Sequence, residues 1–176
     1  MNKTLLSLTL ASLLMAGAVQ AEDRSATVDI SGTVIADNTE CTVNTSTSSV
    51  VMTGKIADLI NQGENATSPN NLNFTIGSSD AASTCIGLVA LQLHGVADDA
   101  DGTALANSET GVTAAKGVGI GLFDNNSQPL AINNNQIVPT NDVSNNTINL
   151  QMVKLTGQTP VEGTVHASLT IDIVRL

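Results

Sequence analysis

The residues that could carry out chemistry are few and poorly arranged for catalysis. The chain has two cysteines, Cys41 and Cys85, and two histidines, His94 and His166. A hydrolytic triad needs a nucleophile, a base and a group that orients the base, and neither histidine lies in a recognisable motif of this kind. His166 falls on the polar side of an alternating run, where surface exposure is expected. The sequence therefore predicts that the protein is not an enzyme, and it indicates no cofactor.

One acidic cluster resembles part of a cation site. Asp98, Asp99 and Asp101 stand in the sequence DDADG, which matches half of a calcium-binding loop. The remaining oxygen ligands and the distal glutamate of such a loop are missing. The two cysteines also lack the close spacing of a zinc site. We therefore interpret the acidic cluster as a solvated turn and predict no metal site.

Composition narrows the possible functions further. The chain of 176 residues has 16 acidic against 6 basic residues, a net charge of −10, and neither Trp nor Tyr. Nucleic-acid binding uses Lys and Arg to neutralise phosphates and aromatic faces to stack on bases, so no nucleic-acid partner is expected. Hydrophobic residues make up 41% of the chain, which is too many for a disordered tail. The length fits one folded domain.

The first 21 residues have the pattern of a secretory signal peptide. Lys3 gives a positive start, residues 5–16 form a short apolar run, and small residues end at Ala21. The run is too short to span a bilayer. Cleavage after Ala21 would remove the single positive charge of Lys3 and change the net charge from −10 to −11. In an exported chain, two cysteines favour one structural disulfide, which chain entropy makes worth about 4 kcal/mol.

Alternation of apolar and polar residues predicts strands at both ends of the mature chain. Ala26, Val28 and Ile30 share one face near the amino end. Five apolar residues share one face near the carboxyl end in the same way: Val165, Ala167, Leu169, Ile171 and Ile173. The two runs can pair within one domain, or one of them can leave its domain and complete the sheet of another subunit. The alternation alone is compatible with both arrangements.

The middle of the chain also favours strands. Strands are predicted over residues 50–53, 72–76, 86–94, 118–123 and 147–155, and a short helix within 54–62. The strands at 86–94 and 118–123 have apolar residues on both faces, as strands covered on both sides do. Clusters of Asn, Asp, Gly and Pro separate these segments. The pattern as a whole indicates an all-β sandwich.

Several blocks of the sequence, in this order and spacing, resemble chaperone–usher fimbrial subunits of the type 1 pilin kind. ATVDISGTVIA precedes the first cysteine, and NLNFTIGSSDAASTC leads to the second. A middle block is GVGIGLFDNNSQPLAIN, and NTINLQMVKLTGQTPVEG leads into the terminal run. Gly163 stands fourteenth from the carboxyl end, as in the terminal motif of the family. The resemblance covers essentially all of the mature chain.

This resemblance implies an incomplete immunoglobulin-like β-sandwich that lacks its last strand. In the family, a periplasmic chaperone supplies that strand first, and the amino-terminal extension of a neighbouring subunit replaces it at an outer-membrane usher. The expected product is a head-to-tail polymer, a fimbria on the cell surface that supports adhesion. The implied organisation is a signal peptide at 1–21, a donor-strand extension at 22–31 and a pilin domain at 32–176.

The resemblance also assigns roles to residues of this chain. The donor strand would present Ala26, Val28 and Ile30. The acceptor groove and chaperone-binding strand would contain Gly163, Val165, Ala167, Leu169, Ile171, Ile173 and Leu176, with the Leu176 carboxylate held by basic chaperone residues. Cys41 and Cys85 match the disulfide of the family. The chain departs from the family in having Arg175 where an aromatic residue is usual, and in lacking a glycine upstream of Ala26.

Two other functions are compatible with parts of the sequence. A self-contained β-sandwich that acts as a binding module in the periplasm or on the cell surface would pair its terminal runs internally. A secreted amyloid-type subunit is suggested by Asn-rich stretches such as residues 133–135. The lack of repeats and the expected disulfide disfavour the amyloid-type subunit.

Overall fold

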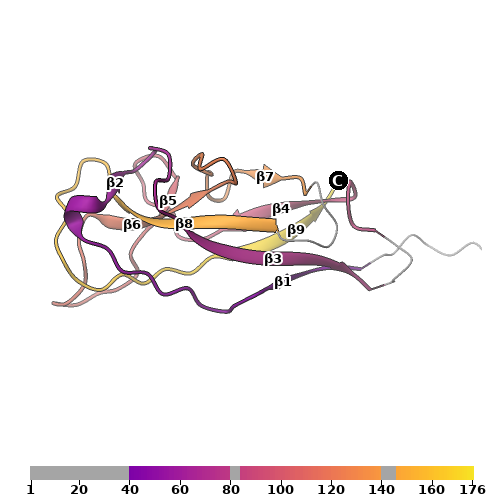
Figure 1. Ribbon diagram of the computed structural model, residues 1–176, viewed down its shortest axis with the longest axis horizontal. Coiled ribbons are helices and arrows are strands. Elements are labelled where there is room, and N and C mark those ends of the chain that lie inside the picture. Colours follow the sequence, from indigo (N-terminus) through magenta and orange to yellow (C-terminus); the bar gives the residue numbers. More distant parts are fainter. Residues whose placement is uncertain (1–39, 80–83, 140–145) are drawn as a thin grey trace, which may run out of the picture. The chain divides into compact units, whose positions relative to one another are not determined.

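The strands that the structure describes form two β-sheets, shown in Figure 1. The computed structural model describes residues 40–79, 84–139 and 146–176. The predicted signal peptide and the predicted donor strand at 22–31 lie outside these residues. Among the described residues, helical structure is confined to one 3-10 turn, η1 (Ile56–Asp58). In the same part of the chain, no helix is long and apolar enough to cross a membrane.

The larger sheet, here sheet A, contains six strands. Its order is β1-β3-β8-β6-β5, and β2 joins β8 in parallel. The other pairs are antiparallel. The bounds are Cys41–Thr45 for β1, Ile60–Asn61 for β2, Asn70–Ser78 for β3, Ala104–Leu105 for β5, Val118–Phe123 for β6 and Asn146–Lys154 for β8. Within the described ranges β1 pairs with β3 alone, so β1 is an edge strand.

The smaller sheet, sheet B, contains three antiparallel strands in the order β7-β4-β9. They are β7 (Gln136–Ile137), β4 (Val89–His94) and β9 (Thr170–Arg175). β4 is central, and its six residues pair along their whole length with β9. No other described strand pairs with β9, which makes β9 the second edge strand of interest.

The main core lies between the two sheets. In β3, Leu72, Phe74 and Ile76 are buried while Asn71 and Asn73 are exposed, as expected for a strand with one face on the core. The inward residues of β4, β6 and β8 join the same cluster: Val89, Leu91, Leu93, Ile120, Leu122, Ile148 and Leu150. A smaller cluster lies on the other face of sheet A and consists of Ala104, Phe123, Val153 and Leu155.

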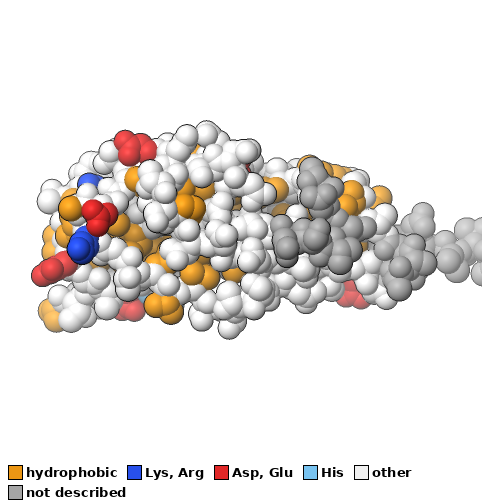
Figure 2. Space-filling view, viewed as in Figure 1, with side chains coloured by type: hydrophobic (Ala, Val, Ile, Leu, Met, Phe, Trp, Pro, Cys, Tyr) orange, Lys and Arg blue, Asp and Glu red, His pale blue; other side chains and the backbone are white. Residues whose placement is uncertain are grey.

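Charged side chains are unevenly spread over the face seen in Figure 2. They gather toward the end of the domain where η1 and β2 lie, and the area over β3 and β8 is largely uncharged. Figure 1 shows β3 and β8 in front of β4 and β9, so this view is onto the outer side of sheet A. The outer side of the sheet is therefore polar without being strongly charged.

Most internal strand predictions are confirmed. The predicted strands at 72–76, 118–123 and 147–155 correspond to β3, β6 and β8, and every residue of β6 is buried. The η1 turn lies within the predicted helical segment at 54–62. The prediction at 86–94 was wrong at its start, because the Leu88 amide bonds to the Cys85 carbonyl and Gly87 has a φ of 73°, a turn conformation that glycine adopts without strain.

One strand prediction was wrong and another was confirmed only in part, because a ladder requires a neighbouring strand. Residues 50–53 form no ladder, although Val50 and Met52 pack on the core and Val51 is 87% exposed. The carboxyl-terminal run is also only partly a strand, since the ladder of β9 begins at Thr170. In both segments the side chains alternate as in a strand, but among the described residues no continuous partner lies alongside.

Candidate functional site

The carboxyl-terminal apolar run forms one wall of the candidate site. Its five members are all partly buried and pack against the main core: Val165, Ala167, Leu169, Ile171 and Ile173. The residues between them are all exposed: His166, Ser168, Thr170 and Asp172. By contrast, Val89, Leu91 and Leu93 on the adjacent strand β4 are at most 1% exposed. The apolar run therefore faces the same core as β4 but is less completely covered.

Residues of β1 and of the segment that follows it form the opposite wall. Cys41 and Val43 on β1, with Val50 and Met52, are partly buried and pack against the same core. Some Cα atoms of β1 lie within 8 Å of Cα atoms of β9. We call these two partly covered apolar rows, taken together, the groove. Sequence reasoning missed this wall. Val51 is as apolar as Val50 and Met52, so the sequence shows no alternation there.

Among the residues that the structure describes, Asn107 and Ser108 hold one edge at the start of the carboxyl-terminal run through hydrogen bonds. The Asn107 side chain donates to the carbonyl of Thr164 (3.0 Å) and accepts from the amide of His166 (2.9 Å). The amide of Ser108 donates to the carbonyl of His166. In an extended chain, the backbone groups of consecutive residues point to opposite edges. Those of Val165 and Ala167 therefore point to the other edge, away from Asn107.

Gly163 stands just before this run and serves close packing. A Cβ at this position would collide with the amide nitrogen of Ala115 and the carbonyl oxygen of Thr113. The neighbouring Thr164 forms backbone hydrogen bonds with both of these residues. A glycine is therefore needed where the chain passes the 113–115 loop and turns into the groove wall.

The carboxyl end of the chain continues the edge of sheet B. The Leu176 amide donates to the Leu88 carbonyl (3.0 Å), and the Leu176 side chain is 66% exposed. Arg175 lies opposite Val89 in the ladder. His94 Nε2 lies 3.5 Å from Asp172 Oδ2 across β4 and β9. Both of these side chains are well exposed, so this pair contributes little to stability.

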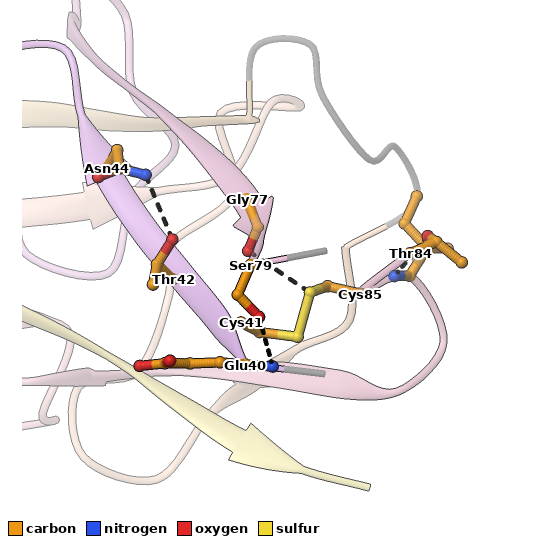
Figure 3. Close-up of a disulfide and its surroundings, with 9 residues drawn as sticks. Glu40, Cys41, Thr42, Asn44, Gly77, Ser79, Thr84 and Cys85 are labelled. Atoms are coloured by element: carbon orange, nitrogen blue, oxygen red, sulfur yellow. Dashed lines mark hydrogen bonds between the residues drawn. A yellow bond between two sulfur atoms is a disulfide. The ribbon is translucent and has the colours of Figure 1, made fainter. Parts of the chain in front are cut away.

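The predicted disulfide is confirmed. It joins Cys41, the first residue of β1, to Cys85, four residues before β4, with a Cα–Cα distance of 6.0 Å (Figure 3). The Cys85 sulfur lies 3.5 Å from the Gly77 carbonyl oxygen. A disulfide sulfur carries no proton, so this is a packing contact rather than a hydrogen bond. The disulfide ties the edge strand of sheet A to the segment that leads into sheet B.

The acidic cluster forms a turn, as interpreted from the sequence. Asp101 Oδ1 accepts hydrogen bonds from the Thr103 amide (2.8 Å), the Thr103 hydroxyl (2.5 Å) and the Gln62 side chain (2.7 Å). Hydrogen bonds within the protein therefore occupy Asp101 Oδ1. Within the described residues, no three His, Cys, Asp or Glu side chains are grouped as metal ligands.

A cavity of about 180 Å³ lies elsewhere in the domain. Its lining includes Phe74, Leu91 and Ile148 and none of the residues predicted for the site. The groove, and not this cavity, is where the predicted acceptor residues converge. The predicted donor residues Ala26 and Val28 lie outside the described part of the chain, as does Ile30.

The comparisons with known proteins agree with this geometry. A family model described as "Fimbrial protein" matches residues 28–174. Among solved structures, the chain is similar to the P pilus rod subunit PapA with a TM-score of 0.52 and 14% identity, over 85% of this chain and 100% of that chain. No curated protein matches the sequence. The structural likeness shows an immunoglobulin-like pilin fold, and the family match shows that the chain belongs to the fimbrial protein family.

Proposed function

We propose that the chain is a structural subunit of a surface fimbria and that its groove accepts a strand from a neighbouring subunit. Its family and its fold are those of structural pilus subunits rather than of enzymes. The observation that carries the proposal is the groove itself. Two partly covered apolar rows meet there at the edges of two sheets, and backbone groups of the carboxyl-terminal run point toward it.

An added strand would both pair with the backbone edge at the groove and cover its apolar rows. Its backbone would pair with the edge of the carboxyl-terminal run, and its alternate side chains would cover the apolar rows. Full burial of an aliphatic side chain contributes about 1.5–3 kcal/mol. Several such side chains and a new ladder would make the complemented domain much more stable than the open one.

The donor is the segment 22–31 of a second copy, with Ala26, Val28 and Ile30 directed into the groove. Their spacing matches the alternation of the groove wall. A contact between the amino end of one copy and the carboxyl-terminal run of the next is heterologous, so it does not close on itself and produces a filament. Neighbouring fimbrial subunits are therefore the permanent partners.

Transient partners follow from the same reasoning. A subunit with an open groove would aggregate through its unpaired edge, so a periplasmic chaperone would occupy the groove first and an outer-membrane usher would order the exchange. The signal peptide at 1–21 would direct export, and the pilin domain at 32–176 would reach the cell surface, where the fimbria supports adhesion. Leu176, at the accessible end of sheet B, would be held by the chaperone.

Charge placed in the groove tests the proposal. We expect Leu169→Asp and Ile171→Asp each to reduce chaperone capture about a hundredfold, because an unpaired carboxylate would enter an apolar site. Thr170→Asp is the matched control, since it adds the same charge to the exposed side of the same run. Co-purification of the chain with a co-expressed chaperone measures the effect.

Undiminished capture of both groove variants would contradict the proposal. A self-contained binding module predicts a different pattern, because such a chain would be a stable monomer without any chaperone. In that case, the three variants would differ in their thermal melts and not in their yield with the chaperone.

A further inference from the structure

The two halves of the carboxyl-terminal run are supported in different ways. β4 pairs with β9 only as far as His94. The chain then passes to sheet A, where Ala97 forms an isolated bridge with Leu105 of β5. A ladder with β4 therefore supports residues 170–175, whereas residues 164–169 lie beyond the reach of that strand.

The Asn107 side chain takes the place of a strand at the start of the run. It lies two residues after the end of β5 and is half-buried. Its Nδ2 group donates to the carbonyls of Thr164 and Ala115, at 3.0 Å each. Its Oδ1 atom accepts from the amides of His166 (2.9 Å) and Glu109 (3.1 Å). A carboxamide has two N–H donors and two acceptor lone pairs, so these bonds use its full capacity.

These bonds fix the backbone of residues 164–166. Thr164 and His166 are held on the same edge of the extended chain, and the Ser108 amide donates to the His166 carbonyl at 2.8 Å. Val165 lies between them and packs against the main core. Its own amide and carbonyl point to the opposite edge, and within the described residues they form no hydrogen bond. One edge of the segment is therefore fixed and the other is open.

We propose that Asn107 is a positioning residue for strand addition. It holds residues 164–166 extended before a donor strand arrives, so that Val165 faces the groove and its open backbone edge is ready to pair. Ordering a flexible segment costs conformational entropy, and an acceptor that is already ordered binds more tightly because binding no longer includes this cost. The inference rests on the proposed function, since it gives Asn107 a role in accepting a strand of a neighbouring subunit.

The release of a bound donor strand tests the proposal. The full chain is complemented with a fluorescent peptide of residues 22–31, and release is followed after an excess of unlabelled peptide is added. We expect Asn107→Ala to accelerate release about tenfold, because residues 164–166 are then free to leave the extended conformation. Asn107→Asp should also accelerate release, since a carboxylate keeps both accepted bonds but can donate neither of the other two.

Asn149→Ala is the matched control. Asn149 on β8 is 8% exposed, and its Nδ2 group donates to the Asp124 carbonyl at 2.9 Å. Neither residue belongs to the groove. Loss of this bond should lower the stability of the domain and leave the release rate of the peptide unchanged. The control therefore distinguishes a variant that weakens the domain from one that disturbs the acceptor.

A second comparison locates the effect within the groove. In the wild type, Val165→Ala and Ile173→Ala should each accelerate release, because each removes apolar contact with the donor. In the Asn107→Ala background, Val165→Ala should add little, since Val165 is no longer held in the groove. Ile173→Ala should keep its full effect there, because Ile173 is still paired with Leu91 of β4.

Two results would overturn the proposal. One is release at the wild-type rate from both Asn107 variants, and the other is an equal effect of Val165→Ala in the two backgrounds. Asn107→Asp carries the same comparisons where Asn107→Ala yields no folded complex. A wild-type chain that retains no labelled peptide would overturn the proposed function itself, and this inference with it.

Discussion

At the scale of single residues, the Phe123 ring on β6 fills the space that Gly121 leaves open. An ideal Cβ at Gly121 would lie 2.7 Å from the Cζ atom of Phe123 and 3.0 Å from the Cγ1 atom of Val153. The missing side chain therefore makes room for a ring that is 2% exposed. Phe74, the other aromatic residue, is 3% exposed. Both aromatic side chains are buried in the domain.

The close contact predicts a large effect of a side chain at Gly121. We expect Gly121→Val to lower the free energy of unfolding by about 1–3 kcal/mol, because the added atoms must displace Phe123. Gly111→Val is the matched control, since a Cβ at that exposed glycine meets nothing within 4 Å. Urea unfolding of the chain complemented with a peptide of residues 22–31 measures both. Equal stability of the two variants would show that the ring is not held as described.

At the scale of elements, the sequence predicted three strands of sheet A but missed β1, although all five residues of β1 pair with β3. β3, β6 and β8 pair continuously with their neighbours. The failures at 50–53 and 164–169 have a common cause, because both segments border the groove. Alternation describes which side chains face the core, but a ladder needs a second strand that the segment itself does not encode.

The candidate site was also predictable only in part, since the sequence indicates one of its two apolar rows. The row from Val165 to Ile173 could be found from its own alternation. The opposite wall of Val43, Val50 and Met52 could not be assigned, because these residues are brought to the core by tertiary packing of β1 and of the segment that follows it. Gly163 matched a family motif, but its packing against the 113–115 loop is a tertiary contact that no local pattern predicts.

The disulfide is a covalent link that holds the edge strand β1 in place. β1 has five residues and pairs only with β3 among the described strands. We expect the double substitution Cys41→Ser with Cys85→Ser to lower the free energy of unfolding by up to about 4 kcal/mol, measured in urea on the same complemented chain. Reductant should weaken the wild type by a similar amount and leave the double variant unchanged. A wild-type chain that is insensitive to reductant would contradict this role.

At the scale of the whole molecule, three properties support the proposed assembly through strand addition. The groove leaves a sheet edge and apolar rows partly uncovered, the fold is that of a pilin, and the family is that of fimbrial proteins. Under the proposed function, a strand from a neighbouring copy would complete this open edge. Assembly and folding would then be linked, because the segment that completes one copy would belong to the next.

The most direct test of this account is the thermal melt of residues 32–176 with and without a peptide of residues 22–31. We expect saturating peptide to raise the Tm by about 5–10 °C at a hundredfold excess over its Kd. A peptide with Val28→Asp should leave the Tm unchanged, because its charge cannot enter the apolar groove. A cooperative melt at the same Tm with the wild-type peptide, the variant peptide or no peptide would contradict the account.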